Sequence, residues 1–275
     1  MKKKDKISVI IPSFNRAVFL EKCINSLCNQ SYRPLEVVII DDGSNDNTQS
    51  IVKKYIEILN SSEFQIKYFH QKNMGAQVAR NRGIKESTGD WLQFLDSDDY
   101  LEKDKLEIQL KSLKKFKADL AICDYKIINE EKNTISLIKN NGNLYFRVAN
   151  GHSLFTGSVL IMRSIVENKI LWNEKLYREQ DKEFLFKVLF LSKKYVHNNN
   201  TFAIYIKHNQ DQITDTYSKT KPQAWEVIRS NVKYLFKNKK YLSFYRVILI
   251  IFHILHIILR LIILYKTKTI LKKII

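Results

Sequence analysis

The stretch Trp91-Leu92-Gln93-Phe94-Leu95-Asp96-Ser97-Asp98-Asp99 decides how the whole chain is interpreted. A short apolar run, which predicts a buried strand, ends in three carboxylates within four residues. Two bare carboxylates at about 4 Å repel by roughly 4 kcal/mol at an effective dielectric near 20. A divalent cation removes that cost, and carboxylate oxygens suit Mg²⁺ or Mn²⁺. The stretch also fits an acidic helix start, because negative side chains favour the positive end of a helix dipole.

Before this stretch, short apolar runs typical of buried strands alternate with segments of helical periodicity. Strands are predicted at Ile7–Ile11, Leu35–Ile40, Phe64–Phe69 and Trp91–Leu95, and helices between them, with Asn15 as the cap of the first and the third over Gly75–Ser87. Such alternation predicts an α/β fold with a parallel sheet and right-handed crossovers. Ligands bind beyond the carboxyl ends of the strands in such sheets.

Polar clusters fall at those predicted strand ends. Ser13 and Asn15 follow the first strand, Asp41 and Asp42 the second, and the acidic stretch the fourth. The chain has no GxGxxG and no GxxxxGK[ST] motif, and it has only 7 glycines. A glycine-rich phosphate cradle is therefore not expected, and a metal is expected to hold an anionic diphosphate instead. Alone, Asp41-Asp42-Gly43-Ser44 would fit an ordinary turn.

Four motifs together give a resemblance. They are Ser8-Val9-Ile10-Ile11-Pro12-Ser13-Phe14-Asn15-Arg16, Val38-Ile39-Ile40-Asp41-Asp42-Gly43-Ser44, Asn73-Met74-Gly75 with Ala79-Arg80-Asn81, and Gly89-Asp90-Trp91 leading into Asp96-Ser97-Asp98-Asp99. Over about the first hundred residues, the chain resembles the family 2 glycosyltransferases of GT-A fold, of the type that builds bacterial surface glycans. The resemblance implies a Rossmann-like, mostly parallel central sheet flanked by helices. It also implies a nucleotide-sugar donor, usually UDP-linked, a Mn²⁺ or Mg²⁺ ion, and inversion at the anomeric carbon.

The resemblance carries site residues over by position. Implied donor-binding residues are Pro12, Phe14, Asn15, Asp41, Asp42, Arg80, Asp96 and Asp98. Pro12 to Phe14 and Asp42 would contact the base, Asp96 the ribose or sugar, and Asp98 the metal at the diphosphate. The implied metal ligands are Asp98, Asp96 and His208, the last from Tyr205-Ile206-Lys207-His208, although a single histidine is more often structural.

Arg178-Glu179-Gln180-Asp181 resembles the family motif whose aspartate is the catalytic base. The match is partial, because Gln180 stands where many members have Glu. A positioned carboxylate is needed to take the proton of an attacking hydroxyl. Asp181 is the expected base and Glu179 the alternative, whereas an acid at the start of a helix can also be structural.

The expected organisation has three parts. Residues 1–100 form the nucleotide-sugar-binding half and residues 101–215 the acceptor-binding half of the same domain, with a strand at Ala118–Tyr125 and a surface hairpin within Asn129–Asn143. Residues 216–275 form basic, amphipathic helices. This tail has 13 Lys/Arg and one acid, a net charge of +12 out of +18 for the chain. A segment with this charge is expected to bind an anionic partner, either nucleic acid or the cytoplasmic face of a membrane.

The apolar run Val247–Tyr265 has 19 residues, about 28 Å as a helix and marginal for crossing a bilayer. His253, His256 and Arg260 form one polar stripe on it. We expect a helix lying on an anionic membrane surface. A spanning helix, or one that packs on the catalytic domain or pairs two chains into a homo-oligomer, remains an alternative.

The tail alternates basic residues with long aliphatic ones rather than a stacking platform, so no nucleic-acid partner is expected. Cys23, Cys28 and Cys123 form no CxxC pair, and the sequence shows no signal peptide, which favours a reducing, cytoplasmic location at the inner face of the cell membrane.

The predicted function is hexosyl or N-acetylhexosaminyl transfer to a glycan or polyprenyl-linked acceptor. The alternative is a non-catalytic protein that binds a nucleotide or a membrane. A nucleotidyltransferase is disfavoured, because Pro12-Ser13-Phe14-Asn15 replaces the glycine-rich loop.

Overall fold

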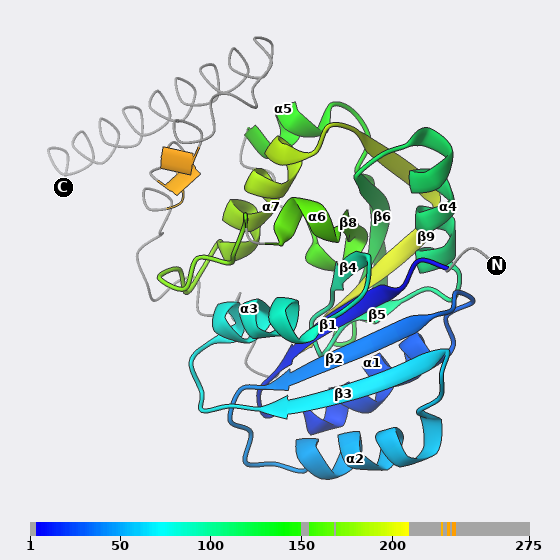
Figure 1. Ribbon diagram of the computed structural model, residues 1–275, viewed down its shortest axis with the longest axis vertical. Coiled ribbons are helices and arrows are strands. Elements are labelled where there is room, and N and C mark those ends of the chain that lie inside the picture. Colours follow the sequence, from blue (N-terminus) through cyan, green and yellow to red (C-terminus); the bar gives the residue numbers. More distant parts are fainter. Residues whose placement is uncertain are drawn as a thin grey trace, which may run out of the picture.

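The computed structural model describes residues 4–149, 154–167 and 169–208, together with positions 227, 230, 231, 233 and 234. A curled sheet with helices on both faces makes up this part of the chain (Figure 1). Its strands are β1 (Ile7–Ser13), β2 (Leu35–Asp41), β3 (Phe64–His70), β4 (Trp91–Phe94), β5 (Tyr100–Leu101), β6 (Leu120–Asn129), β7 (Thr134–Ile138), β8 (Val159–Met162) and β9 (Tyr195–Lys207).

The first four strands form the parallel sheet that the sequence predicts. They lie in the order β3-β2-β1-β4, and every neighbouring pair is parallel. All residues of β1 and β2 are buried. Near-continuous β-branched runs are typical of parallel strands covered on both faces, which explains why these segments alternate so little. The polar residues after β1, β2 and β4 therefore meet at one edge.

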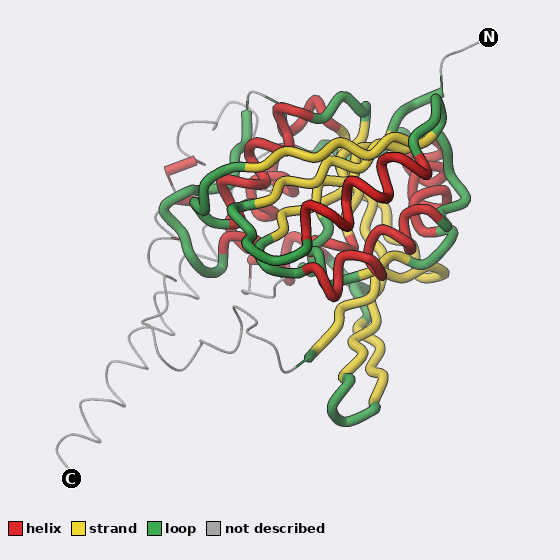
Figure 2. Tube along the Cα trace, turned by 90° about the horizontal axis from the view of Figure 1, so that it is seen from below, coloured by secondary structure: helices red, strands yellow, loops and turns green. Residues whose placement is uncertain are grey.

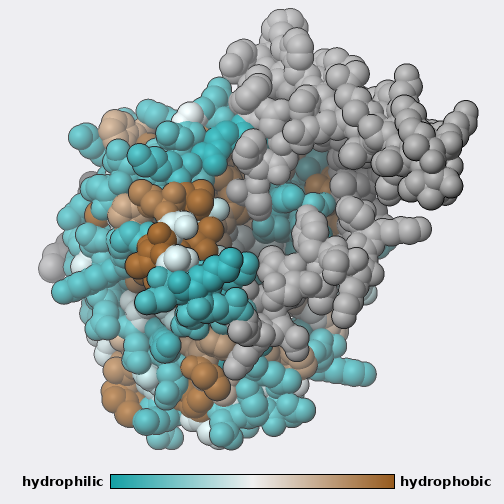
Figure 3. Space-filling model, turned by 180° about the vertical axis from the view of Figure 1, so that it is seen from behind, coloured by the Kyte–Doolittle hydropathy of each residue, from teal (hydrophilic) through white to brown (hydrophobic). Residues whose placement is uncertain are grey.

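Beyond β4 the sheet is mixed. β8 pairs antiparallel with both β4 and β6, β9 runs parallel to β6, and β5 pairs antiparallel with β9. A hairpin forms from β6 and β7 and projects from the molecule (Figure 2); its turn and second strand lie in the predicted range, whereas its first strand pairs from Tyr125 onward. On it, Ile135 is 69% and Leu137 48% exposed. Seen from behind, the surface is mostly hydrophilic with apolar patches (Figure 3).

Helices cover the two faces of the sheet. They are α1 (Ala17–Cys28), α2 (Thr48–Leu59), α3 (Ala76–Glu86), α4 (Lys105–Phe116), α5 (Leu144–Ala149), α6 (Arg163–Val166) and α7 (Gln180–Leu191), with a 3₁₀ turn, η1 (Thr156–Ser158). One core packs α1, α2 and α4 against the sheet. A second core, on the other face, joins α3, α5, α6 and α7.

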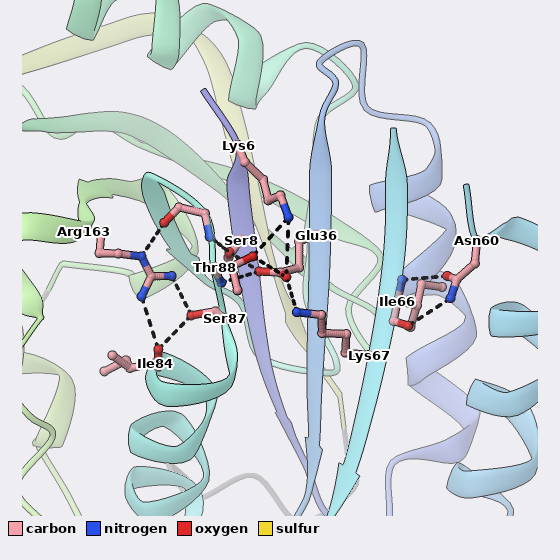
Figure 4. A network of polar contacts seen from close by, with 11 residues as sticks. Lys6, Ser8, Glu36, Asn60, Ile66, Lys67, Ile84, Ser87, Thr88 and Arg163 are labelled. Carbon is pink, nitrogen blue, oxygen red and sulfur yellow. Dashed lines mark hydrogen bonds and ion pairs between the residues drawn. The ribbon is translucent and has the colours of Figure 1, made fainter. Parts of the chain in front are cut away.

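A buried carboxylate ties the strands together near their amino ends. Glu36 on β2 is fully buried and accepts hydrogen bonds from Ser8 Oγ at 2.5 Å, Lys67 Nζ at 2.6 Å, and the backbone N–H and hydroxyl of Thr88 at 2.8 and 2.9 Å (Figure 4). These bonds join β1, β2, β3 and the turn before β4. They lower the pKa of Glu36 to about 2 against the opposing effect of burial.

Three expectations need comment. Asn15 does not cap α1, because the residue at that position is Arg16 and the Asn15 backbone is left-handed, with φ of 50°. The three cysteines are free thiols, of which Cys23 and Cys123 are buried and Cys28 is partly exposed. Within the described residues no helix is long and apolar enough to cross a membrane, whereas the run Val247–Tyr265 lies outside them.

Candidate active site

The loops that follow β1, β2 and β4 enclose a cavity of about 380 Å³. Six of the predicted donor-binding residues line it: Pro12, Phe14, Asp42, Arg80, Asp96 and Asp98. Arg16, Asn73, Ser97 and Tyr205 also contribute to the wall. A parallel sheet brings these residues together because the carboxyl ends of its strands share one edge.

Asp42 shapes the rim of this cavity. One carboxylate oxygen accepts hydrogen bonds from Gln71 Nε2 at 2.8 Å and the Met74 backbone N–H at 2.9 Å, and the other accepts one from the Gly75 N–H at 2.7 Å. Gly43 has a φ of 88° and packs closely against the loop before α3, because a Cβ atom there would be 2.9 Å from the Asn73 backbone nitrogen. Asp42 therefore holds the loop before α3 while it faces the cavity.

Asp41 and Asn15 lie behind the cavity wall rather than in it. Asp41 accepts hydrogen bonds from the Ser44 N–H at 2.8 Å and from the Tyr68 hydroxyl. Burial, together with the bond to Asp41, raises the pKa of Tyr68. Asn15 Oδ1 accepts a hydrogen bond from the Asn45 N–H at 3.0 Å. Both residues brace the loops after β1 and β2.

Arg80 connects two distant parts of the chain. Its guanidinium lies 2.6 Å from Asp96 Oδ1 and 3.1 Å from Gln180 Oε1, and it stacks 4.4 Å above the Trp172 ring. Arg80 is 7% exposed. The arginine on α3 therefore fixes the carboxylate after β4 relative to the start of α7.

Asp98, which lines the first cavity, is hydrogen-bonded to His208. Asp98 Oδ2 lies 3.1 Å from His208 Nε2 and 4.0 Å from Arg16 Nε. The His208 ring stacks on Phe19 with the centroids 4.2 Å apart. Burial, and secondly the charge of Asp96, raises the pKa of Asp98. A carboxylate whose charge is this costly to hold has the chemistry that a cation would stabilise.

Asp99, the third acid of the stretch, points into the interior. Its Oδ1 accepts the Ile206 N–H at 2.9 Å, and burial raises its pKa well above the usual value. Among the described residues, no group of three or more His, Cys, Asp or Glu side chains is arranged to hold a metal. Mg²⁺ sites commonly use one or two carboxylates with water and substrate phosphates, so Asp98, with His208 Nε2 3.1 Å from its Oδ2, offers donor atoms of the kind such an ion would need.

A second cavity of about 430 Å³ adjoins the first and shares Arg80, Asp96 and Tyr205 with it. Glu179 and Asp181 both line it. Glu179 adopts a left-handed backbone at the start of α7, with φ of 53°, and its carboxylate accepts from Lys182 Nζ at 2.9 Å. Both candidate bases therefore line the same cavity as Arg80.

Several wall residues had no predicted role. Arg16 and Tyr205 belong to motifs quoted in the sequence analysis. Their place in those motifs could have identified them as residues of the cavity wall. Gln180 was noted for its mismatch with the family motif, but its bond to Arg80 crosses 100 positions of sequence. Trp172, fully buried beneath Arg80, gives no local signal.

Comparison with known proteins matches the chain to glycosyltransferases. The family model described as glycosyl transferase family 2 matches residues 8–191. The glycosyltransferase GlyA of Streptococcus pneumoniae is 34% identical over 151 residues, 55% of this chain and 21% of that protein. An uncharacterized glycosyltransferase of Rickettsia typhi is 30% identical over 69% of this chain and 60% of its own length. The chain thus covers less than two thirds of these relatives.

Solved structures share the fold. The Staphylococcus aureus TarS fragment 1–349 in complex with UDP-GlcNAc has a TM-score of 0.69 at 23% identity, over 84% of this chain and 66% of that chain. The Pyrobaculum calidifontis mannosyltransferase PcManGT, in complex with GDP-Man and Mn²⁺, has a TM-score of 0.59 at 16% identity, over 90% and 79% of the two chains. At these identities the likeness shows a common GT-A architecture.

Proposed function

The chain belongs to glycosyl transferase family 2, and from that premise we propose that it moves a sugar from a nucleotide diphosphate, with UDP as the expected nucleotide, to a hydroxyl group of an acceptor. The observation that carries the proposal is the pair of adjoining cavities that share Arg80, Asp96 and Tyr205. Residues 1–100 are assigned the donor and residues 101–215 the acceptor. The TarS complex with UDP-GlcNAc supports a UDP-linked donor.

We assign the nucleotide to the first cavity. Pro12 and Phe14 would contact the base, with the loop held by Asp42 around it, and Asp41 and Asn15 would support that loop from behind. Arg80 would place a positive charge beside the phosphates or the sugar. Asp98, Asp96 and His208 would hold Mn²⁺ or Mg²⁺. When bound there, the ion would neutralise the charge on the departing diphosphate.

The acceptor hydroxyl would attack from the second cavity with inversion at the anomeric carbon. Asp181 is the proposed base that takes the hydroxyl proton as the new bond forms. Glu179, whose carboxylate accepts a hydrogen bond from Lys182, is the alternative. Because the departing group is a diphosphate, no separate protein acid is required.

The acceptor is proposed to be a glycan or a polyprenyl-linked saccharide at the cytoplasmic face of a membrane. The support is the basic composition of residues 216–275, whose surface-binding role stays a prediction. Liposome flotation with and without anionic lipid tests it, because a tail that binds by charge should bind anionic vesicles and release them in high salt.

A screen of nucleotide sugars with Mn²⁺ tests the central proposal. We expect UDP release from at least one UDP-sugar, loss of that release in chelator, and loss of both turnover and metal-dependent UDP binding in Asp98→Ala. Glu131→Gln, an exposed carboxylate on the β6–β7 turn, is the matched control and should behave as wild type. UDP binding without turnover of any donor and acceptor mixture would favour the non-catalytic alternative, and equal turnover in chelator would refute the metal role.

A further inference from the structure

A lysine lies fully buried beneath the wall of the second cavity. Lys105, the first residue of α4, has 0% of its surface exposed, and its ammonium donates a hydrogen bond to Oε1 of Gln93 on β4. Among the described residues, the ammonium pairs with this amide oxygen rather than with a carboxylate. Burial lowers the pKa of Lys105 to about 8. The fold therefore retains this cation at a cost, which calls for a physical reason.

The contact with Lys105 fixes the direction of the Gln93 amide. An ammonium group can only donate, so the amide oxygen must face it and the amide nitrogen must face the other way. That nitrogen donates at 2.6 Å to the carbonyl of Phe94 on its own strand, and it also lies 3.3 Å from the carbonyl oxygen of Thr156 and 3.1 Å from that of Gly157. In the reversed orientation the amide oxygen would face and repel these two carbonyls, and Gly157 O would lose this donor, whereas Thr156 O would keep the Val159 backbone N–H. Lys105 and the carbonyls thus favour the same orientation of the amide, and Lys105 fixes its oxygen end while the nitrogen end holds η1.

The remaining carbonyl of η1 is held in the same way. Ser158 O accepts hydrogen bonds from Gln109 Nε2 at 2.9 Å and from Cys123 Sγ at 3.4 Å. Gln109 lies one helical turn after Lys105 on α4. Buried backbone carbonyls without partners are costly, so the side chains of α4, β4 and β6 together determine where this turn sits.

The turn η1, with the residue before it, forms part of the wall of the second cavity. Phe155 and Thr156 both line the second cavity. The Phe155 ring packs against Tyr125 and Tyr205, with centroid distances of 5.3 and 5.7 Å. A Cβ atom at Gly157 would lie 2.6 Å from a ring carbon of Phe155. The space around this ring is so tight that a shift of η1 must move the ring as well.

We propose that Lys105 is a positioning residue for the second cavity: by orienting Gln93 it holds η1, and η1 sets where Phe155 and Thr156 face an acceptor. The assignment of this cavity to an acceptor rests on the proposed function, whereas the coupling between Lys105 and η1 does not. A hydrophobic residue at position 105 would avoid the buried charge but would leave the buried Gln93 Oε1 without the donor that Lys105 supplies, which weakens the hold on the amide.

Amide hydrogen exchange, followed by mass spectrometry, tests the coupling without an acceptor. Lys105→Met keeps the length of the side chain and removes its donor, and Lys111→Met makes the same change at a lysine that is 74% exposed on the same helix. We expect peptides covering residues 154–160 to exchange at least tenfold faster in Lys105→Met, with peptides from β1 and β2 within twofold of wild type. Lys111→Met should match wild type throughout. Unchanged exchange in 154–160, or an equal increase in every strand, would overturn the proposal.

Gln93→Met removes the amide at the other end of the link and should reproduce the same local increase. If neither variant folds, as judged by circular dichroism, Lys105 serves global stability and the positioning role is rejected. Calorimetric titration with UDP and Mn²⁺ adds a second readout, in which both variants should bind UDP within twofold of wild type. Failure of the wild type to turn over any nucleotide sugar would refute the proposed function and leave the exchange result to decide the role of Lys105.

Discussion

Glu36 offers the sharpest test of the physical reasoning. In Glu36→Gln, the new amide group must direct its nitrogen either at the Thr88 backbone N–H or at the Lys67 ammonium, both of which can only donate. The pKa of Glu36 falls from 4.5 to about 2. At 1.36 kcal/mol for each pKa unit, the native contacts favour the carboxylate by roughly 3 kcal/mol. Because the side chain is fully buried, water screens little of this energy.

The pH dependence has a definite sign. A lowered folded-state pKa means that the stability is fully present above pH 4.5 and is lost as the pH falls toward 2. Urea denaturation should therefore show Glu36→Gln less stable than wild type by about 3 kcal/mol at pH 7, and by about half of that near pH 3. Glu57→Gln, at an exposed position on α2, controls for the change of charge. A difference below about 1 kcal/mol at pH 7, or one that is the same at pH 3, would refute the reasoning.

Three further predictions concern the site and its surroundings. Asp181→Asn should lower sugar transfer by about a hundred- to ten-thousandfold with UDP binding by calorimetry unchanged, whereas a larger loss in Glu179→Gln would move the base to Glu179. Gln180→Glu would give Arg80 a second carboxylate partner beside Asp96, so UDP should bind more weakly, and equal or tighter binding in calorimetry would argue against a donor role for Arg80. The pKa of Lys105 is lowered from 10.5 to about 8. The free energy of unfolding of the wild type should therefore rise between pH 8 and pH 10.5, by up to about 3 kcal/mol relative to that of Lys105→Met. A difference between the two proteins that does not change with pH in urea titrations would contradict the cost of the buried charge.

The sheet of the donor half was predictable because its signal is local. Ile7–Ile11 and Leu35–Ile40 are apolar runs that only a strand covered on both faces accommodates. β9 shows the opposite case, since His197-Asn198-Asn199-Asn200 lacks strand character. It is held in place by pairing with β6 across a register shift between Cys123 and Asp124, and neighbouring strands override weak intrinsic preference.

The site was predictable in position but not in its bonding. The sequence located Asp42 and Asp98 correctly at the strand ends, yet it gave no sign that both oxygens of Asp42 hold the loop before α3. Contacts that join residues far apart, such as Arg80 with Gln180, depend on how α3 and α7 pack. Asn15 was expected to cap a helix and instead joins two loops, because both uses satisfy the same amide side chain.

Arg80, Asp96 and Tyr205 form a partition common to both cavities. Under the proposed assignment of the cavities, a donor that displaces the Arg80 guanidinium would also change the acceptor cavity, so we expect the two substrates to bind interdependently. We expect steady-state kinetics of compulsory order, with the nucleotide sugar entering before the acceptor and UDP leaving last. Product inhibition by UDP that is competitive toward the sugar donor and non-competitive toward the acceptor would be its signature, and a random order would show that the partition does not move.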